Sequence, residues 1–358
     1  MAKMIVAGVI APQELIAIWG RGTTLINETE LDRLTHLFYA AVSVNSGVDP
    51  IDTGIWVWDD SWTSKSWLTM TTEAAHAHGA KALLSFLGTG GTHIRSLDTI
   101  MGNPTLRASL ITNLLKFMAD YGFDGLDIDW ESYEMPLGTH SQKLDVFLRE
   151  LRARMPAGKL LTIDGGFSGT YNYPDIPVST VTDGIIDWVN VMAYDLWEQP
   201  PAPDPAYHSW YEHVVILVNK WINAGFPRDK LVLGVPFYGK DHTRRPFLYR
   251  DIVDTLDPAP DQDLAYGLGT LKGTSGAQEP VVDPLWWNGS DTCRRKAQLV
   301  LNERLGGAYY EDLGYDKLHT PYSLATVIED TLAAAAPIPS QASWTPLAIG
   351  AGLILILP

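Results

Sequence analysis

The sequence has very little cysteine, a shortage of positive charge and no long apolar run, and each shortage excludes something. Cys293 is the only cysteine among 358 residues, so no disulfide can form within the chain. With 26 basic residues against 42 acidic ones, the net charge is -16, which repels the phosphate backbone of nucleic acids. We therefore expect no nucleic-acid partner, whereas a neutral polymer would be indifferent to this charge.

Metal-ligand and phosphate-binding patterns are also missing. The nine histidines show no His-Glu-x-x-His or similar spacing. The glycine-rich stretch Gly88–His93 lacks the Gly-Lys-Ser/Thr ending of a phosphate-binding loop. The sequence therefore predicts no metal and no cofactor.

Apolar segments lie at both ends of the chain. Met4–Ile10 resembles the core of a secretion signal, but no small-residue cleavage site follows it, and we interpret it as a buried first strand. The segment Leu347–Leu357 is shorter than the ~20 residues that span a bilayer. We treat residues 337–358 as a tail of unknown role: a truncated membrane anchor, a docked strand or an oligomer contact.

Short β-rich runs alternate with amphipathic helical stretches along the chain. The predicted strands are Met4–Ile10, Thr35–Val42, Lys81–Leu87, Gly125–Glu131, Leu160–Gly165, Trp188–Tyr194, Leu231–Pro236 and Gly307–Glu311. The predicted helices are Lys65–His78, Pro104–Tyr121, Ser141–Met155, Tyr211–Ala224, Thr292–Arg304 and Ser323–Ala334. Eight alternating units predict an α/β fold, a closed (β/α)8 barrel, with a doubly wound open sheet as the second architecture.

Chain length alone suggests two domains of about 150 residues, but one α/β barrel takes about 250 residues and more with insertions. The widest gap between predicted strands lies between the seventh and the eighth, and residues 240–290 within it are rich in Pro, Gly and Asp. We therefore predict a single barrel domain over residues 1–336, in which this short insertion is loop with limited regular structure.

Acidic and apolar residues alternate in Tyr121–Glu131, YGFDGLDIDWE. Residues two apart on a strand point the same way, about 6–7 Å apart, so Asp127, Asp129 and Glu131 share one face. In a barrel that face points inward, and Glu131 lies at the carboxyl end, where barrel enzymes build their sites. Two charges about 5 Å apart repel by ~3 kcal/mol at an effective dielectric constant near 20, enough to keep one carboxyl protonated as a general acid.

Other interpretations of these acids are a solvated charged strand, a calcium loop and a magnesium site. A solvated strand does not explain the apolar residues between the acids, and a calcium loop needs a flexible segment with a central glycine. A magnesium site is the weaker alternative to acid/base catalysis, which we prefer. Asp124, which precedes the strand, is interpreted as structural.

The run DGLDIDWE at Asp124–Glu131 resembles the D-G-x-D-x-D-x-E signature of glycoside hydrolase family 18, the chitinases and endo-β-N-acetylglucosaminidases. The resemblance covers about residues 4–334. Other stretches resemble further strands of the family, in order: Leu34–Ala40, Lys81–Gly88, Val189–Asp195, Leu231–Lys240 and Gly306–Asp316.

This resemblance implies an enzyme, a retaining glycosidase that cleaves β-1,4 bonds next to N-acetylglucosamine in chitin or chito-oligosaccharides. The nucleophile would be the acetamide oxygen of the substrate. Glu131 would protonate the leaving oxygen and then activate water. Asp129 would orient the acetamide N–H, and Asp127 would share a proton with Asp129. Tyr194 would donate its hydroxyl to the acetamide oxygen.

The candidate sugar-binding residues are Asp195, Tyr39, Trp197, Glu311, Tyr238 and Trp287. The two tryptophans are included because oligosaccharide clefts use aromatic rings as platforms. The family usually carries a tryptophan under the sugar on its eighth strand, and Glu311 occupies that position here. If the register differs from this one, Tyr309 or Tyr310 would supply the ring instead. Ala41 and Leu87 are two further departures in the sugar-binding floor.

Two alternatives to a chitinase remain at this point. One is an endo-β-N-acetylglucosaminidase acting on glycans or peptidoglycan. The other is a chitin-binding lectin without activity, although such members usually lack the acid that Glu131 supplies. The expected substrate implies a secreted or extracellular protein, with no clear signal peptide in the sequence, and membrane contact through the tail stays open.

Overall fold

The computed structural model describes residues 4–10, 31–45, 52–57, 62–88, 91–130, 137–166, 176–196, 204, 206–273 and 277–334. Of residues 9–10, 62–64, 91–94 and 137–139 it describes only the backbone. The apolar tail lies outside these ranges, so its three interpretations stay predictions. Among the described helices, none is long and apolar enough to cross a lipid bilayer.

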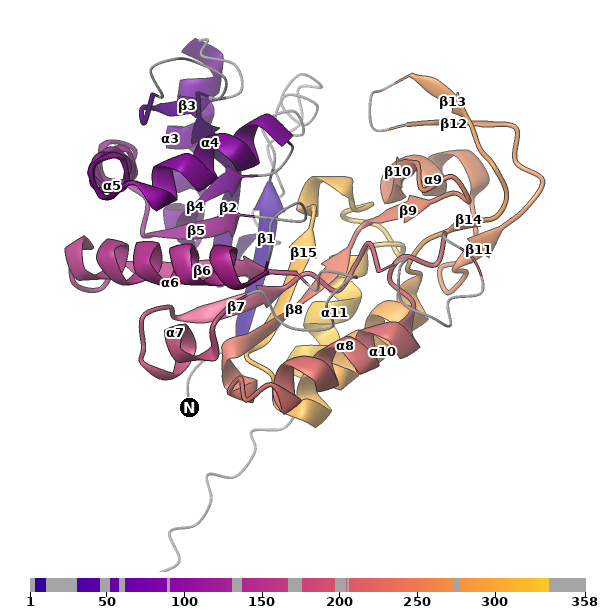
Figure 1. Ribbon diagram of the computed structural model, residues 1–358. Coiled ribbons are helices and arrows are strands. Elements are labelled where there is room, and N and C mark those ends of the chain that lie inside the picture. The colour runs from indigo at the N-terminus through magenta and orange to yellow at the C-terminus, as the bar shows by residue number, and fades with distance from the viewer. Residues whose placement is uncertain are drawn as a thin grey trace, which may run out of the picture.

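Within the described residues, eight parallel strands close into a barrel (Figure 1). They are β1 (Ile5–Ile10), β2 (His36–Val44), β4 (Lys81–Gly88), β5 (Gly125–Trp130), β6 (Leu160–Gly165), β7 (Trp188–Val191), β8 (Leu231–Pro236) and β15 (Gly307–Glu311). Strand β1 pairs with both β15 and β2, so the sheet has no free edge at that point. This closure confirms the (β/α)8 prediction and excludes the open sheet. The short β3 (Ile55–Val57) pairs antiparallel with the end of β2.

Helices surround the barrel and cover its outer face (Figure 1). They are α3 (Trp62–Ala77), α4 (Gly91–Gly102), α5 (Pro104–Asp120), α6 (Leu137–Arg154), α7 (Val178–Thr182), α8 (Tyr211–Asn223), α10 (Ser290–Glu303) and α11 (Leu324–Ala333), with 3-10 turns η1 (Arg228–Lys230) and η2 (Leu313–Tyr315). The sequence predicts all of these except α4, α7 and the two turns. Helix α5 begins where the Asn103 side chain accepts from the N–H groups of Thr105 and Leu106, with Pro104 in the first helical position.

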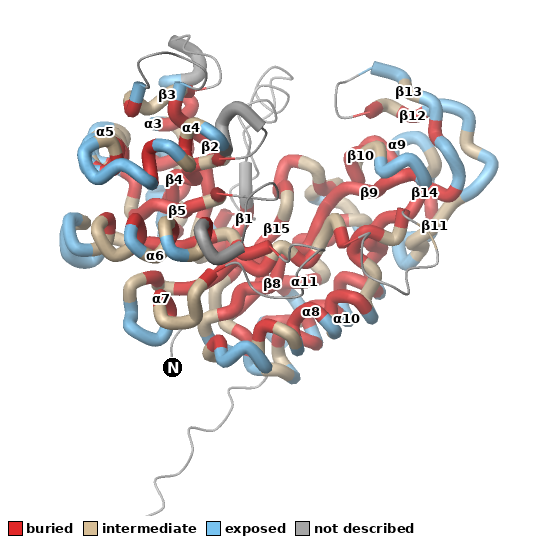
Figure 2. The backbone as a smooth tube through the Cα atoms, in the orientation of Figure 1, coloured by how far each residue is buried: buried red, intermediate tan, exposed pale blue. Residues whose placement is uncertain are grey.

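The main core lies between the strands and the helices. Figure 2 shows the strands buried and the outward helix faces exposed. Leu126, Ile128 and Trp130 of β5 are each at most 3% exposed and belong to this core together with Leu144 and Phe147 of α6. The apolar face of β5 therefore meets the helices, as its alternation predicts, and the opposite face points into the barrel.

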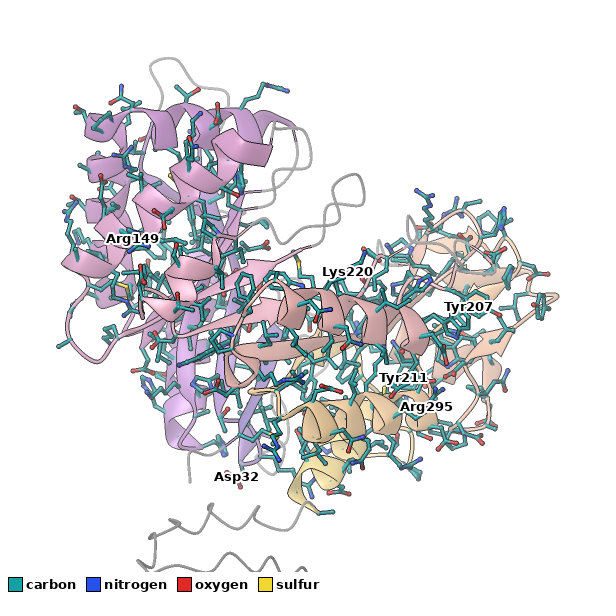
Figure 3. The ribbon with its side chains drawn as sticks, turned by 60° about the horizontal axis from the view of Figure 1, so that its bottom comes forward. Asp32, Arg149, Tyr207, Tyr211, Lys220 and Arg295 are labelled. Carbon is teal, nitrogen blue, oxygen red and sulfur yellow. The ribbon has the colours of Figure 1, made fainter. Side chains whose placement is uncertain are left out.

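Two neighbouring helices show how the outer layer is held on its solvent side. The guanidinium of Arg295 on α10 lies 3.8 Å from the ring centre of Tyr211 on α8 (Figure 3). Arg295 also donates to Glu212 at 3.1 Å. Such exposed contacts add little stability by themselves. They link α8, which follows β7, to α10, which follows the insertion.

The insertion between β8 and β15 contains more regular structure than the sequence predicts. It comprises β9 (Tyr238–Lys240), β10 (Pro246–Leu248), α9 (Tyr249–Leu256), β11 (Leu264–Ala265), β12 (Thr270–Lys272), β13 (Gln278–Pro280) and β14 (Leu285–Trp286). The strands form an antiparallel sheet of order β10-β9-β14-β11 and a separate β12–β13 pair. The insertion stands to one side of the barrel (Figure 1). Its strands are too short to show a two-residue period, which is why the sequence indicated loop.

Candidate active site

Asp127 lies in the barrel interior, where three neighbouring strands hold its carboxylate. It is 1% exposed. Its Oδ1 accepts from Thr162 Oγ1 at 2.5 Å and from Asn190 Nδ2 at 3.1 Å, and its Oδ2 accepts from Ser85 Oγ at 3.2 Å. Burial raises the pKa of Asp127 to about 6, although the hydrogen bonds from Thr162 and Ser85 oppose this shift. The strand thus places inward a carboxyl that can hold a proton near neutral pH, as its alternation predicts.

Asp129 and Asp164 lie side by side, one step nearer the carboxyl ends of the strands. Ile128 pairs with Ile163 across β5 and β6, so the residue after each faces the same side. Both acids are partly exposed. Burial, and then the charges of Asp127 and Asp129, raise the pKa of Asp164 well above its usual range. The sequence analysis missed Asp164, although the same two-residue period on β6 could have found it.

Two tyrosines meet beside these acids. The hydroxyl of Tyr194, just past β7, lies 2.6 Å from that of Tyr309 on β15. Gly234 of β8 makes room for both rings, because an added Cβ would lie 2.8 Å from the Tyr309 ring and 3.0 Å from the Tyr194 ring. Burial raises the pKa of both hydroxyls well above the usual value, and nearby carboxylates raise it further. Both groups therefore stay protonated, so each keeps a hydrogen to donate.

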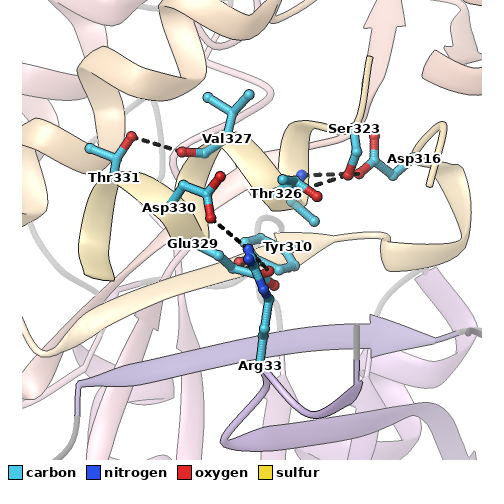
Figure 4. A network of polar contacts seen from close by, with 10 residues as sticks. Arg33, Tyr310, Asp316, Ser323, Thr326, Val327, Glu329, Asp330 and Thr331 are labelled. Carbon is cyan, nitrogen blue, oxygen red and sulfur yellow. Dashed lines mark hydrogen bonds and ion pairs between the residues drawn. The ribbon is translucent and has the colours of Figure 1, made fainter. Parts of the chain in front are cut away.

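Glu311 ends β15 on the inward side, as Tyr309 does two residues earlier. Its charge raises the pKa of Asp164 and of Tyr194, which places it at the same open end of the barrel. Tyr310 points the opposite way: it is fully buried in the helix layer, and its hydroxyl donates to Glu329 of α11 (Figure 4). Glu311 therefore occupies the inward position at the end of the strand. Tyr310 cannot supply a ring there because it points into the helix layer, and Tyr309 lies deeper in the barrel than Glu311.

Asp195 joins the barrel to the insertion. Its Oδ1 lies 2.6 Å from Lys240 Nζ and 3.1 Å from His208 Nδ1, and it accepts from the Tyr238 hydroxyl at 3.1 Å. Burial alone would raise the pKa of Asp195, but His208 and Lys240 outweigh it and lower the pKa. The Tyr238 ring stands edge-on to Tyr194 at 6.3 Å. The two predicted residues Asp195 and Tyr238 therefore adjoin Tyr194. The sequence analysis missed His208 and Lys240.

The described residues contain no group of three or more His, Cys, Asp or Glu that could hold a metal ion. The carboxylate of Asp127 accepts hydrogen bonds from two hydroxyls and an amide, and these donors surround it. This arrangement is suited to moving protons and binding polar groups.

Comparison with known proteins identifies the family. The sequence model of glycosyl hydrolases family 18 matches residues 16–316. The chain belongs to glycosyl hydrolases family 18.

Curated relatives of family 18 agree with this assignment. A class V chitinase of Arabidopsis thaliana is 32% identical over 231 residues, which cover 60% of this chain and 58% of that protein. The Nod factor hydrolase protein 1 of Medicago truncatula is 30% identical over 320 residues, covering 79% of this chain and 80% of that one. The chain thus spans a little over half of the Arabidopsis protein.

The fold is also shared with solved structures. A mutant class V chitinase from Nicotiana tobaccum, in complex with NAG4, superposes with a TM-score of 0.68. It is 22% identical, and the match covers 92% of this chain and 99% of that one. At this identity the likeness supports the barrel fold alone.

Two of the residues predicted to bind sugar are buried elsewhere. Tyr39 is fully buried on the outward face of β2, with its ring 6.4 Å from that of Phe123. Its neighbour Phe38 points into the barrel, so the alternation of the strand turns Tyr39 away. Trp287 is 1% exposed in the core of the insertion. Both predictions are wrong, because neither ring reaches a surface where a sugar could lie.

Glu131 and Trp197 lie outside the described residues, and their assignments stay predictions. Asp124 has the structural place expected of it in this family-18 strand. Its Oδ2 accepts from Ala82 N at 3.0 Å and lies 2.7 Å from His76 Nε2, which ties β5 to β4 and α3.

Proposed function

We propose that this chain hydrolyses β-1,4 bonds next to N-acetylglucosamine in chitin or chito-oligosaccharides. The observation that carries the proposal is that Asp129, Asp164 and the Tyr194–Tyr309 pair lie near one another at one end of the barrel, with the protonatable Asp127 behind them. Family membership supports it, as does a relative named a chitinase.

The proposed reaction uses the acetamide oxygen of the substrate as nucleophile and retains the anomeric configuration. An amide that attacks needs an acceptor for its N–H and a donor for its carbonyl oxygen. Asp129 provides the acceptor and Tyr194 the donor. Asp127, whose pKa is about 6, can take up and return a proton as the charge on Asp129 changes. Glu131, which directly follows Trp130 in the sequence and was assigned this role by the resemblance, protonates the leaving oxygen.

A second candidate is an endo-β-N-acetylglucosaminidase that acts on glycans or peptidoglycan. The observation in its favour is Glu311, a carboxylate at the position where the family usually has a tryptophan. A carboxylate offers hydrogen-bond acceptors to sugar hydroxyls and no ring for stacking, which changes the sugar that fits best.

The proposal is tested by incubating the protein with chito-oligosaccharides and following product length and anomer. The matched control for Glu131→Gln is Glu212→Gln, an exposed acid on α8. We expect β-anomeric initial products from the parent and from Glu212→Gln, and a loss of about 100-fold or more in Glu131→Gln.

Three results would contradict parts of this proposal. Binding without cleavage by the parent would identify a lectin. Cleavage of glycans or peptidoglycan in preference to chito-oligosaccharides would favour the second candidate. Initial α-anomers would exclude the acetamide mechanism.

A further inference from the structure

We propose that Tyr309 is a positioning residue that donates its hydroxyl hydrogen to Tyr194, so that Tyr194 can give its own hydrogen to the acetamide oxygen. The inference rests on the proposed function and deepens it. It concerns which of two hydroxyls supplies the hydrogen between them.

A tyrosine hydroxyl has one hydrogen to donate and can also accept one. Only one hydrogen lies in the 2.6 Å contact between Tyr194 and Tyr309. If Tyr194 supplied it, Tyr194 would have none left for a substrate. If Tyr309 supplies it, the hydrogen of Tyr194 is free to point at the open end of the barrel.

The burial of the two residues selects the second order. Tyr309 is 1% exposed and packs in the barrel interior with apolar neighbours such as Phe38 and Val232. Within the part of the chain that the structure describes, its hydroxyl has no hydrogen-bond partner except Tyr194. Tyr194 is partly exposed and adjoins Tyr238. Only Tyr194 can therefore reach a sugar.

Nearby charges keep the pair in its donating form. Asp164 and Glu311 raise the pKa of both hydroxyls beyond the effect of burial, so neither loses its hydrogen at ordinary pH. A hydroxyl that accepts a hydrogen bond also becomes a better donor, because neighbouring hydrogen bonds polarise one another. Tyr309 thus both orients Tyr194 and strengthens its bond to the acetamide oxygen.

The test is a double-mutant cycle with Tyr309→Phe, Tyr194→Phe and the double variant, measured by kcat and KM on a chito-oligosaccharide. We expect Tyr309→Phe to lower kcat about 3- to 10-fold, the effect of one lost hydrogen bond, with KM changing less than about twofold. In the Tyr194→Phe background the same change should add less than about twofold, because Tyr309 acts through Tyr194.

Tyr310→Phe is the matched control. It removes a hydroxyl from the next residue of the same strand, on the side that faces Glu329 and away from the barrel interior (Figure 4). It should keep the kinetics of the parent. Thermal unfolding of every variant checks that each is folded, and Tyr309→Met, which also removes the hydroxyl, replaces Tyr309→Phe if the latter is unfolded.

A second substrate separates the acetamide from the leaving group. On a dinitrophenyl chitobioside, whose leaving group needs no proton, the loss in Tyr309→Phe should persist, because the acetamide still has to attack. A loss that disappears on this substrate would show that Tyr309 acts on protonation of the leaving group, and would overturn the inference.

Unchanged kcat in Tyr309→Phe, or equal losses in both backgrounds, would also overturn it while leaving the proposed function intact. Absence of cleavage by the parent would instead overturn the proposed function and the inference together.

Discussion

At the scale of residues, the site depends on how the barrel interior places protons among several carboxyl groups. Asp127 is surrounded by Thr162, Ser85 and Asn190, which can hydrogen-bond its ionised form, yet burial dominates and keeps its pKa near 6. Asp164 is pushed the same way by burial and by its acidic neighbours. The interior therefore binds protons at a pH where the same carboxyl groups in an unfolded chain are ionised.

This proton binding predicts how stability depends on pH. The pKa of Asp127 is about 6 in the fold and about 4 in an unfolded chain, so the native state binds more protons between these values. The free energy of unfolding should then fall as pH rises from about 4 to about 6, by up to about 3 kcal/mol from this residue. Asp127→Asn removes that contribution.

Denaturant unfolding of the parent and of Asp127→Asn at pH 4, 5, 6 and 7 measures the effect. Relative to the parent, the variant should gain stability as pH rises through this range. A difference between the two proteins that stays constant with pH would contradict the assignment of the proton to Asp127.

Alternation along one strand was sufficient to predict the inward placement of Asp127 and Asp129, because a two-residue period needs only local sequence. The same period holds for Asp164 on β6 and turns Tyr39 away from the interior on β2. His208 could not be found in this way. It reaches Asp195 from the loop before α8, and no local pattern encodes the distance between two loops.

At the scale of elements, the strands of the barrel were the most predictable part of the fold. Strands β6, β8 and β15 have the bounds that their apolar runs predict, because each is buried on both faces. Strand β7 is shorter than predicted and ends at Val191, which leaves Tyr194 on the following loop. The insertion depends on long-range antiparallel pairing between strands of two or three residues, which sequence periodicity does not reveal.

Gly234 of β8 lies where a larger side chain would collide with β7, with Tyr194 on the loop after it, and with Tyr309 of β15. An added Cβ would lie 2.7 Å from the Val191 oxygen as well as against the two tyrosine rings. Gly234→Ala should lower the free energy of unfolding by about 1–3 kcal/mol, because the core cannot absorb the methyl group without moving. It should also separate the two hydroxyls and lower kcat.

The control is Gly269→Ala, since an added Cβ at Gly269 meets nothing within 4 Å. Chemical denaturation and chito-oligosaccharide kinetics of the two variants provide the comparison. Parent-like stability and activity in Gly234→Ala would show that β8 can move away from its neighbours.

At the scale of the whole molecule, the insertion contributes to the site from outside the barrel. Lys240 belongs to β9, which pairs with β10 and β14 of the insertion sheet, and its ammonium lies 2.6 Å from Asp195. Asp195 itself follows β7 and takes a left-handed backbone conformation with φ of 57°. One ion pair thus joins a barrel loop to a separate sheet beside the carboxylates.

Loss of this ion pair should change the pH dependence of activity. Lys240 lowers the pKa of Asp195, so Lys240→Met should raise that pKa and reduce the ionised form of Asp195, the form that we propose binds sugar hydroxyls. We expect the acidic limb of the kcat/KM profile to move to higher pH, and kcat/KM at neutral pH to fall roughly 10-fold.

Lys272→Met provides the control, because Lys272 belongs to β12 of the same insertion and pairs with Asp251 at 3.5 Å. If both variants kept the profile of the parent, the insertion would hold Asp195 by packing alone. If both moved it equally, the cause would be the net charge of the insertion, because Lys272 has no contact with Asp195.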